Sequence, residues 1–227
     1  MVFLFQLTVQ ARLGEEGYAA FFYQYGMVPD FFVDGPRPYW TLLTNIFLHG
    51  GWLHLIGNIW TLYIFGDNVE DRMGRIPYLV FYLLCGLFAD GAHILFNWGS
   101  NIPAIGASGA IAGVMGAYMF LFPKSRILML IPIFYIPFFF RMWAVLYLAY
   151  WFLLQLVNGT YDFAQGMDGA GVAFWAHIGG FVGGIVLYNL FVNRTYQEPP
   201  QYFTYKEGPK GMFRRDQQEG YRYLRRD

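Results

Sequence analysis

Residues 106–118 are Gly-Ala-Ser-Gly-Ala-Ile-Ala-Gly-Val-Met-Gly-Ala-Tyr, in which one serine lies at the start of an apolar run rich in small residues. Pro103 marks a turn before this stretch, and no charged residue follows Ser108 until Lys124, so we expect a helix that begins near Ser108. Unpaired backbone N–H groups and the positive end of that helix would face the Ser108 hydroxyl and stabilise negative charge developing there. Ser108 is thus a candidate nucleophile, and the alternative is that it only caps the helix.

The composition is typical of a membrane protein. Of 227 residues, 56% are hydrophobic, 22% are aromatic and only 13% are charged. The formal net charge is zero, so nothing indicates binding to nucleic acid, and the single cysteine, Cys85, excludes an intrachain disulfide. No H-E-x-x-H motif occurs and the four histidines lack a ligand spacing, so we expect neither a metal nor another cofactor.

The apolar runs predict an all-α fold, a polytopic membrane helical bundle of six spans. Residues 1–9 are too few to cross a bilayer, so we interpret them as the outer part of a first span whose beginning is missing. Residues 12–44 would be a long connection at the membrane interface, rich in glycine, proline and aromatic residues. The other expected spans cover residues 49–65, 77–97, 108–122, 142–157 and 171–192.

Two further segments complete the expected organisation. Residues 127–140 are apolar but contain Pro132 and Pro137, which cannot continue a regular helix without a kink, so we expect a broken or interfacial segment. Residues 193–227 are polar and basic and contain no apolar run, which indicates a flexible cytoplasmic tail without a core of its own. The chain would therefore divide into a membrane domain, residues 1–192, and this tail.

Basic residues orient the expected spans. Those near the span ends fall on one side of the bundle: Arg72, Arg75, Lys124, Arg126, Arg141 and Arg194. Because Lys and Arg are enriched on the cytoplasmic side of membrane proteins, that side should face the cytoplasm. His49, Ser108 and the start of the last span would then lie toward the extracytoplasmic side, and the compact six-span plan favours a prokaryotic plasma membrane.

Two faces of small residues indicate a partner for Ser108. In the last span, His177 shares a helical face with Gly180 and Gly184. In the span at residues 108–122, Ser108 shares a face with Ala112 and Gly116, and Gly109 lies beside that face. Small faces let helices approach closely, which would bring the His177 imidazole opposite the Ser108 hydroxyl. Such a pair is what a serine nucleophile and its general base require, although a purely structural contact is the alternative.

Polar residues of another expected span could bind an oxyanion. His54 and Asn58 are four residues apart, so both project from one helix face as side-chain donors. The alternative is that they pair with each other or with the backbone. His49, one turn after Asn45, is more simply interpreted as a structural anchor of the preceding loop.

These residues carry a family resemblance. His49, His54 and Asn58 occur in His-Gly-Gly-Trp-Leu-His-Leu-Ile-Gly-Asn, Ser108 in Gly-Ala-Ser-Gly, and His177 in Ala-His-Ile-Gly-Gly. In that order, and with Glu-Asp-Arg-Met-Gly at residues 70–74, the chain resembles the rhomboid intramembrane serine proteases from about residue 40 to residue 188.

The resemblance implies a function and a set of roles. It implies a Ser108–His177 dyad without an acidic third member, and an oxyanion site made by His54, Asn58 and the backbone N–H of Ser108. It also implies that transmembrane proteins in the lipid bilayer are the substrates and that the cut lies in or near their spans. The structural support of the site would come from four residues: His49, Gly106, Gly109 and Gly180. A movable loop at residues 158–171, rich in glycine, would cap a hydrated cavity.

Some positions differ from the family's commoner pattern, and two other functions remain open. Ala112 stands where some bacterial relatives place a tyrosine beside the catalytic histidine, so the sequence does not identify what orients His177. Thr41 follows Trp40 where many relatives have arginine, so the sequence does not identify what anchors the first loop. Rhomboid-like proteins without the dyad hold client proteins, which makes a non-catalytic binder the strongest alternative. A small transporter with a proton or ion site at Asp90 and His93 is less favoured, because the spans show no internal repeat. Nothing indicates the oligomeric state.

Overall fold

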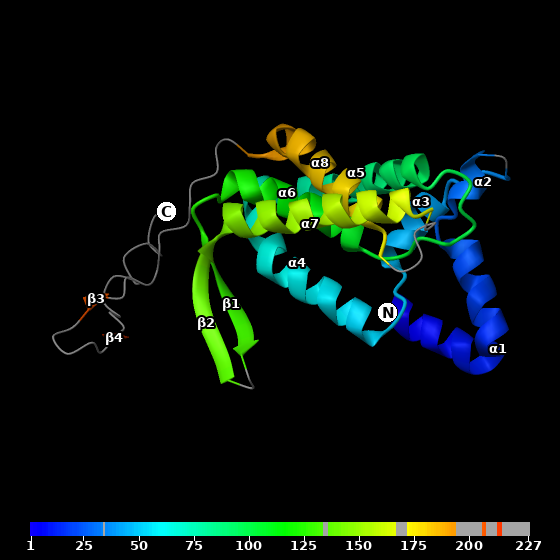
Figure 1. Cartoon of the computed structure of the whole chain (residues 1–227), viewed down its shortest axis with the longest axis horizontal. Helices are drawn as coiled ribbons and strands as arrows, with labels where there is room; N and C mark the ends of the chain where they lie inside the picture. The colour runs from blue at the N-terminus through cyan, green and yellow to red at the C-terminus, as the bar shows by residue number, and fades with distance from the viewer. Residues whose placement is uncertain (34, 134–135, 167–171, 194–205, 208–212, 215–227) are drawn as a thin grey trace, which may run out of the picture. The chain divides into compact units, whose positions relative to one another are not determined.

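The structure is a computed structural model that describes residues 1–33, 35–133, 136–166, 172–193, 206–207 and 213–214. The chain separates into two units, Met1–Val192 and Asn193–Asp227. The first unit is mostly helical (Figure 1). Within the second, two short strands, β3 (Lys206–Glu207) and β4 (Phe213–Arg214), form an antiparallel pair.

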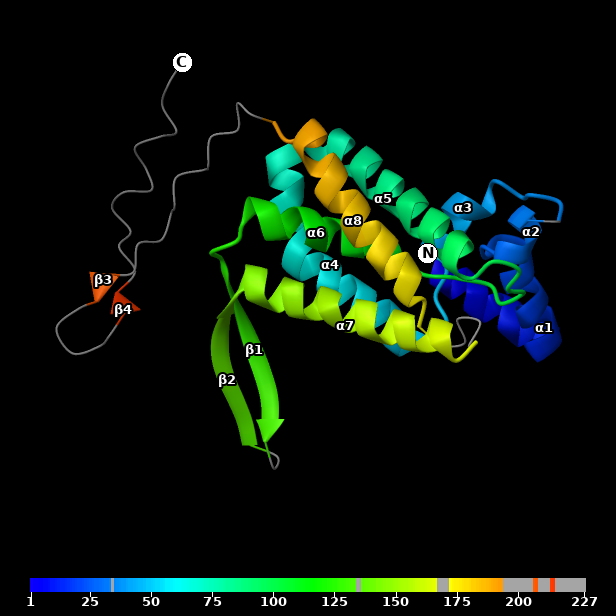
Figure 2. The ribbon, with the colours of Figure 1, turned by 45° about the horizontal axis from the view of Figure 1, so that its top comes forward.

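Five helices form the bundle that contains Ser108, His177, His54 and Asn58. They are α4 (Trp52–Met73), α5 (Arg75–Phe96), α6 (Ser108–Leu121), α7 (Ala144–Ala164) and α8 (Phe174–Phe191). Helix α6 contacts each of the other four (Figure 2). Every residue from Gly109 to Tyr118 is buried. The expected helix start at Ser108 is confirmed, and α6 is the centre of the fold.

Glycines set the spacing between α6 and α8. A Cβ atom built on Gly180 would overlap the carbonyl oxygen of Gly109, and one on Gly184 would overlap that of Gly113. The two backbones therefore touch directly, as small residues at helix interfaces permit. The predicted meeting of the two small-residue faces is confirmed.

The six expected spans are only partly reproduced. Among the described residues, α5 and α8 are the two helices that are long and apolar enough to cross a membrane, and α6 is a shorter apolar helix. Helices α4 and α7 are of similar length, at 22 and 21 residues, but α4 carries several charged and amide side chains and α7 several tyrosines. Length and apolar character alone thus select two of these helices.

The N-terminal region differs from the expected connection at residues 12–44. Helix α1 runs over Val2–Tyr25 with a kink at Gly14, whose φ of 69° and ψ of −169° are non-helical. Ring pairs four residues apart stabilise its second half: Tyr18 with Phe22, and Phe21 with Tyr25. The prediction of a loop from residue 12 was wrong because these aromatic residues, interpreted as interfacial, follow the helical period.

Short elements lead from α1 to α4. They are α2 (Pro29–Val33), α3 (Thr41–Thr44) and the 3-10 helix η1 (Asn45–Phe47). Helix α3 and η1 join end to end. The connection from α1 to α4 thus contains three short helical segments.

A β-hairpin forms at residues 127–140, where a broken or interfacial segment was expected, so the all-α prediction was wrong here. Strands β1 (Arg126–Ile133) and β2 (Ile136–Trp143) pair antiparallel, with Arg126 opposite Trp143 and Pro132 opposite Pro137. Proline disfavours helix, while the isoleucines and phenylalanines of this run favour strand. The hairpin follows α6 and precedes α7 along the chain, and Figure 1 shows it extending away from the ends of these helices.

The boundary after α7 also differs from expectation. The Gly-rich loop was expected at residues 158–171, but α7 continues to Ala164 and includes Gly159. Gly159 lies against Phe174 and Trp175 of α8, where its missing side chain allows close packing. The remaining connection begins at residue 165, and residues 167–171 lie outside the described residues.

Candidate active site

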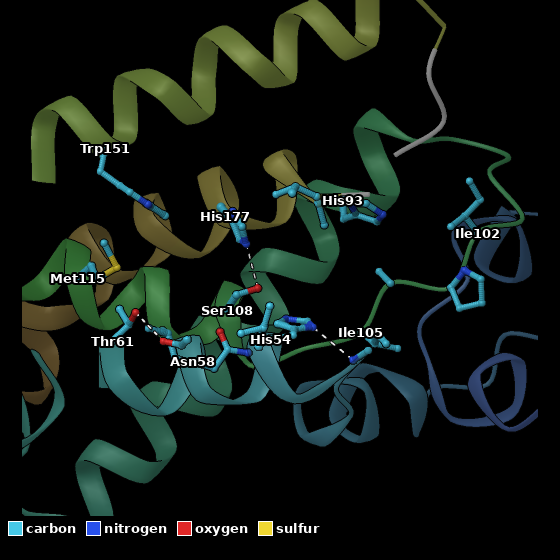
Figure 3. Close-up of a pocket in the computed structure, with 18 of the residues that line it drawn as sticks. His54, Asn58, Thr61, His93, Ile102, Ile105, Ser108, Met115, Trp151 and His177 are labelled. Atoms are coloured by element: carbon cyan, nitrogen blue, oxygen red, sulfur yellow. Dashed lines mark hydrogen bonds between the residues drawn. The ribbon is translucent and has the colours of Figure 1, made fainter. Parts of the chain in front are cut away.

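Ser108 and His177 face each other at one end of the bundle. The His177 Nε2 atom lies 2.9 Å from the Ser108 Oγ atom, within hydrogen-bond distance (Figure 3). Ser108 is the first residue of α6 and His177 lies in the first turn of α8, so both are at helix N-termini. Because Gly109 and Gly180 bring the two backbones into contact next to this pair, the small-residue interface sets the distance between hydroxyl and imidazole.

His54 points into the same space from α4. Its Nδ1 atom accepts a hydrogen bond from the backbone N–H of Gly50 at 3.3 Å. A neutral imidazole that accepts at Nδ1 carries its proton on Nε2. The His54 Nε2–H group is therefore the available donor, and Figure 3 shows this ring beside Ser108.

Asn58 lies one turn after His54 on α4 and is 9% exposed. Within the described part of the chain, its Nδ2 atom is buried without a hydrogen-bond partner. Both residues line the cavity that contains Ser108, and among the described contacts no hydrogen bond joins them. A buried amide without a partner is costly, so Asn58 is suited to a ligand oxygen.

Gly106 lets the backbone pass close to His54. Its φ is 124°, a conformation that residues with side chains rarely adopt. A Cβ atom there would lie 2.7 Å from His54 Cε1 and Nε2 and 3.7 Å from Ser108 Oγ. The Gly106 N–H donates to the carbonyl oxygen of Asn45 at 2.9 Å, which fixes the approach to Ser108.

The cavity around these groups has a volume of about 610 Å³. Its lining includes residues of α4, α5, α6, α7, α8 and the segment before α6, and it combines the polar residues above with apolar ones such as Met115 and Trp151. Thr61, more than two turns into α4, and Tyr147, in the first turn of α7, also line it. The space thus extends from Ser108 between α4 and α7.

Backbone hydrogen bonds hold the segment before α6. Met27 and Ala104 form an isolated antiparallel bridge, with N–O distances of 3.0 and 2.8 Å. Asn45 donates through Nδ2 to both carboxylate oxygens of Asp90, at 2.8 and 2.9 Å, and both side chains are buried. Asn45 thereby joins α5 to the backbone of Gly106.

Asp90 and His93 are not partners in the described structure. Asp90 bonds Asn45, whereas the Nδ1 atom of His93 lies 3.2 Å from Asn97 Nδ2. A proton site at Asp90 and His93, the basis of the transporter alternative, would require the two groups to share a site. Their separate partners disfavour that alternative.

Substituting Asn45 tests this support. Asn45→Ala removes the donor to the buried Asp90 carboxyl, and we expect the free energy of unfolding to fall by about 1–3 kcal/mol. Unfolding in detergent micelles would measure it. Asn68→Ala is the matched control, since the Asn68 side chain is only partly buried and bonds the carboxylate of its neighbour Asp67, so its effect should stay within about 0.5 kcal/mol. Equal stability of the two variants would contradict this role of Asn45.

His49 is held by a residue whose role the sequence did not reveal. Gln6 of α1 is fully buried; its Nε2 donates to the His49 carbonyl oxygen at 2.9 Å and its Oε1 accepts the His49 N–H at 3.1 Å. The His49 ring lies edge-on to the His54 ring, with 5.2 Å between centroids. The signal in the sequence was one amide side chain within an otherwise apolar run of residues 1–9.

Gln155 of α7 is the second residue whose role the sequence did not reveal. Its Oε1 atom lies 2.9 Å from the Nδ1 atom of His177, on the ring edge opposite Ser108. His177 thus has a partner at each ring nitrogen. Within the described residues, no group of three or more His, Cys, Asp or Glu side chains could hold a metal ion.

Comparison with known proteins gives the family context of this arrangement. A rhomboid domain model matches residues 36–194. The chain is similar to Rhomboid protease GluP of Bacillus subtilis (strain 168), with 32% identity over 147 residues, which are 64% of this chain and 25% of that protein. It is 29% identical over 174 residues to RHOMBOID-like protein 1 of Arabidopsis thaliana, covering 76% of this chain and 39% of that one.

A further relative carries the word inactive in its name. Inactive RHOMBOID-like protein 8 of Arabidopsis thaliana is 33% identical over 86 residues, which are 38% of this chain and 24% of that protein. The matched segments span between about a quarter and two-fifths of the length of these three relatives. Both a named protease and a named inactive protein thus resemble this chain.

Proposed function

Because this chain belongs to the rhomboid family, we propose that it is a serine endopeptidase that cleaves single-span membrane proteins in or near their transmembrane segments. The observation that carries the proposal is the 2.9 Å approach of His177 Nε2 to Ser108 Oγ inside a cavity. Relatives that bear the name protease, such as GluP, support the same chemistry.

The proposed mechanism follows from the roles that each atom can take. Ser108 Oγ attacks the carbonyl carbon of the scissile bond while His177 Nε2 takes its proton, and His177 then gives the proton to the leaving amine. The resulting acyl-enzyme is hydrolysed by water, which His177 activates in the same way.

The proposed oxyanion site comprises the side chains of His54 and Asn58 and the backbone N–H of Ser108. Asn58 Nδ2 has no hydrogen-bond partner among the described residues, and His54 carries its proton on Nε2, so both groups can donate to the developing negative charge. The N-terminus of α6 adds its positive dipole end at the same place. No acidic residue takes part in this proposal.

The proposed setting is a multi-pass protein with the six-span plan in a prokaryotic plasma membrane. The N-termini of α4, α6 and α8 carry the site, and basic residues cluster at the other helix ends, among them Arg72, Arg75 and Lys124. Because basic residues are enriched on the cytoplasmic side of membrane proteins, the helix ends that carry them face the cytoplasm and the site faces the extracytoplasmic side. We further propose that residues 1–192 form the membrane domain and residues 193–227 a basic cytoplasmic tail.

The experiment that tests this function is reconstitution. The full chain and a single-span membrane protein would be placed together in lipid vesicles, and products identified by mass spectrometry. We expect one cut in or near the substrate span. Binding of the intact substrate without any cut, across a panel of single-span proteins, would contradict the protease proposal and favour the non-catalytic binder.

Asn58→Ala tests the oxyanion site. Removing one such donor costs about 10²- to 10³-fold in kcat in other hydrolases, and we expect a loss of that size here, smaller than the loss on removing Ser108. Steady-state cleavage in vesicles would measure kcat and KM separately. Asn68→Ala, at a partly exposed position of the same helix, is the control and should retain wild-type rates. A wild-type kcat for Asn58→Ala would exclude Asn58 from the oxyanion site.

A further inference from the structure

Gln155 places a neutral amide against His177. It lies on α7, is 8% exposed, and is the one Gln, Asn or charged side chain among residues 144–157. Its Oε1 atom is 2.9 Å from His177 Nδ1, while Ser108 Oγ is 2.9 Å from Nε2 on the other edge of the ring. Gln155, His177 and Ser108 therefore form a continuous chain of hydrogen bonds that joins α7, α8 and α6.

The orientation of the Gln155 amide is set by a second contact. Its Nε2 atom donates to the carbonyl oxygen of Trp151, one turn earlier on α7, at 3.3 Å. A rotated amide would place its oxygen against that carbonyl oxygen, and two acceptors repel. The Trp151 contact consequently turns the amide oxygen toward His177. The Trp151 ring also packs near the imidazole, with 5.8 Å between the centroids.

This orientation selects one tautomer of the imidazole. A neutral histidine accepts a proton at Nε2 only if its own proton is on Nδ1. In buried surroundings that Nδ1–H group needs an acceptor, because an unpaired buried donor costs free energy. The amide oxygen of Gln155 is an acceptor and so favours the tautomer that can act as base toward Ser108.

We propose that Gln155 is a positioning residue that holds His177 in its Nδ1–H tautomer and aims Nε2 at Ser108, an inference that rests on the proposed protease function. When His177 takes the Ser108 proton, both of its ring nitrogens carry hydrogen. Gln155 continues to accept from Nδ1–H and receives no proton, so it supports the imidazolium as a dipole rather than as a charge. Gln155 thus bonds the same histidine nitrogen that the acidic residue bonds in a Ser-His-Asp triad.

Kinetic measurements on Gln155 variants test this role. Gln155→Leu keeps the size of the side chain and removes the acceptor, and we expect kcat to fall about 10- to 100-fold while KM changes less than about threefold. Gln155→Glu keeps an oxygen that can accept from Nδ1–H, and a protonated carboxyl can still donate to the Trp151 carbonyl. We therefore expect Gln155→Glu to recover most of the loss.

The matched control is Asn158→Leu. Asn158 lies on the same helix and is exposed, and its Nδ2 donates to the carbonyl oxygen of Leu154 at 2.9 Å. Gln155 makes the same kind of bond to the residue four positions earlier. The Asn158 amide bonds that backbone oxygen on its own helix rather than the imidazole of His177. Cleavage by Asn158→Leu should match wild type.

A spectroscopic readout is independent of cleavage. In protein labelled with ¹⁵N at histidine, two-bond nitrogen–hydrogen spectra distinguish the two tautomers, and the His177 signal is identified by its loss in His177→Ala. We expect the Nδ1–H tautomer in wild type and a mixture in Gln155→Leu. If Gln155→Leu does not fold, the wild-type spectrum still decides, since an Nε2–H tautomer there would overturn the proposal.

The outcomes separate this inference from the function on which it rests. Wild-type kcat in folded Gln155→Leu, together with lost cleavage in Ser108→Ala, would overturn the role of Gln155 and leave the protease intact. Equal cleavage by wild type and Ser108→Ala would overturn the protease itself. A loss in Gln155→Leu that Gln155→Glu reverses supports the positioning role.

Discussion

Ser108→Ala should reduce cleavage of a membrane substrate by about 10⁴-fold or more, and His177→Ala by a similar factor. In the proposed mechanism, the attacking oxygen and its base act as one unit across their 2.9 Å contact, so removing either would abolish the covalent step. For the same reason the double variant should lose no more than either single variant. Cleavage rates in vesicles with each variant at equal amounts would measure this.

The control for Ser108→Ala is Ser125→Ala. Ser125 lies just beyond the opposite end of α6 from the candidate site, so its variant should cleave at the wild-type rate. Unfolding midpoints in detergent micelles should show that all of these variants remain folded. Substantial cleavage by folded Ser108→Ala, or multiplicative losses in the double variant, would contradict a shared Ser–His step.

Gly180→Ala should destabilise the bundle and remove activity. The added Cβ would overlap the Gly109 carbonyl oxygen and lie 2.8 Å from its carbonyl carbon, and backbone atoms cannot rotate away. Helices α6 and α8 must therefore separate, which moves Ser108 away from His177. We expect the free energy of unfolding to fall by about 1–3 kcal/mol, as overpacking usually costs, and cleavage to fall with it.

Gly91→Ala is the matched control for this change. It introduces the same methyl group at an α5 position where nothing lies within 4 Å of the new atom. Alanine has the higher helix propensity, so stability should be unchanged or rise by up to about 1 kcal/mol. Titration of each variant with a denaturing detergent would compare them. If Gly180→Ala proved as stable as Gly91→Ala, close α6–α8 packing would not determine the geometry of the site.

The pairing of α6 with α8 was predictable because its signal is local. Small residues recur at three- and four-residue intervals around Ser108 and His177, and such faces pack against each other in membranes. The start of α6 was equally visible, since a turn and a long apolar run bracket Ser108. These patterns in the sequence suffice to place the two residues together, while their catalytic roles stay a prediction.

The N-terminal region and the hairpin could not be predicted because their signals were ambiguous. Aromatic residues at 18–25 suit an interface and a helix equally, and only ring pairs such as Tyr18 with Phe22 show the helical outcome. Residues 127–140 are apolar throughout, so neither a helical nor a strand period stands out. Antiparallel pairing between β1 and β2 decides the second case.

Polar residues inside apolar runs were visible, but their partners were not. Gln155 bonds His177, which is 22 positions away in the sequence. The partners of Gln6 and Asn45, His49 and Asp90, are 43 and 45 positions away. No local period relates such pairs. An isolated amide in an apolar segment should therefore be treated as a candidate support for a site even when its partner is unknown.

Covalent labelling of Ser108 tests the central claim most directly. A fluorophosphonate reacts with a serine whose hydroxyl is activated by a base, and mass spectrometry of the digested protein locates the adduct. We predict one adduct in wild type, on the peptide that contains Ser108, none in Ser108→Ala, and strongly reduced labelling in His177→Ala. An adduct that persists in Ser108→Ala, or labelling of Ser108 that does not depend on His177, would contradict a nucleophile activated by His177.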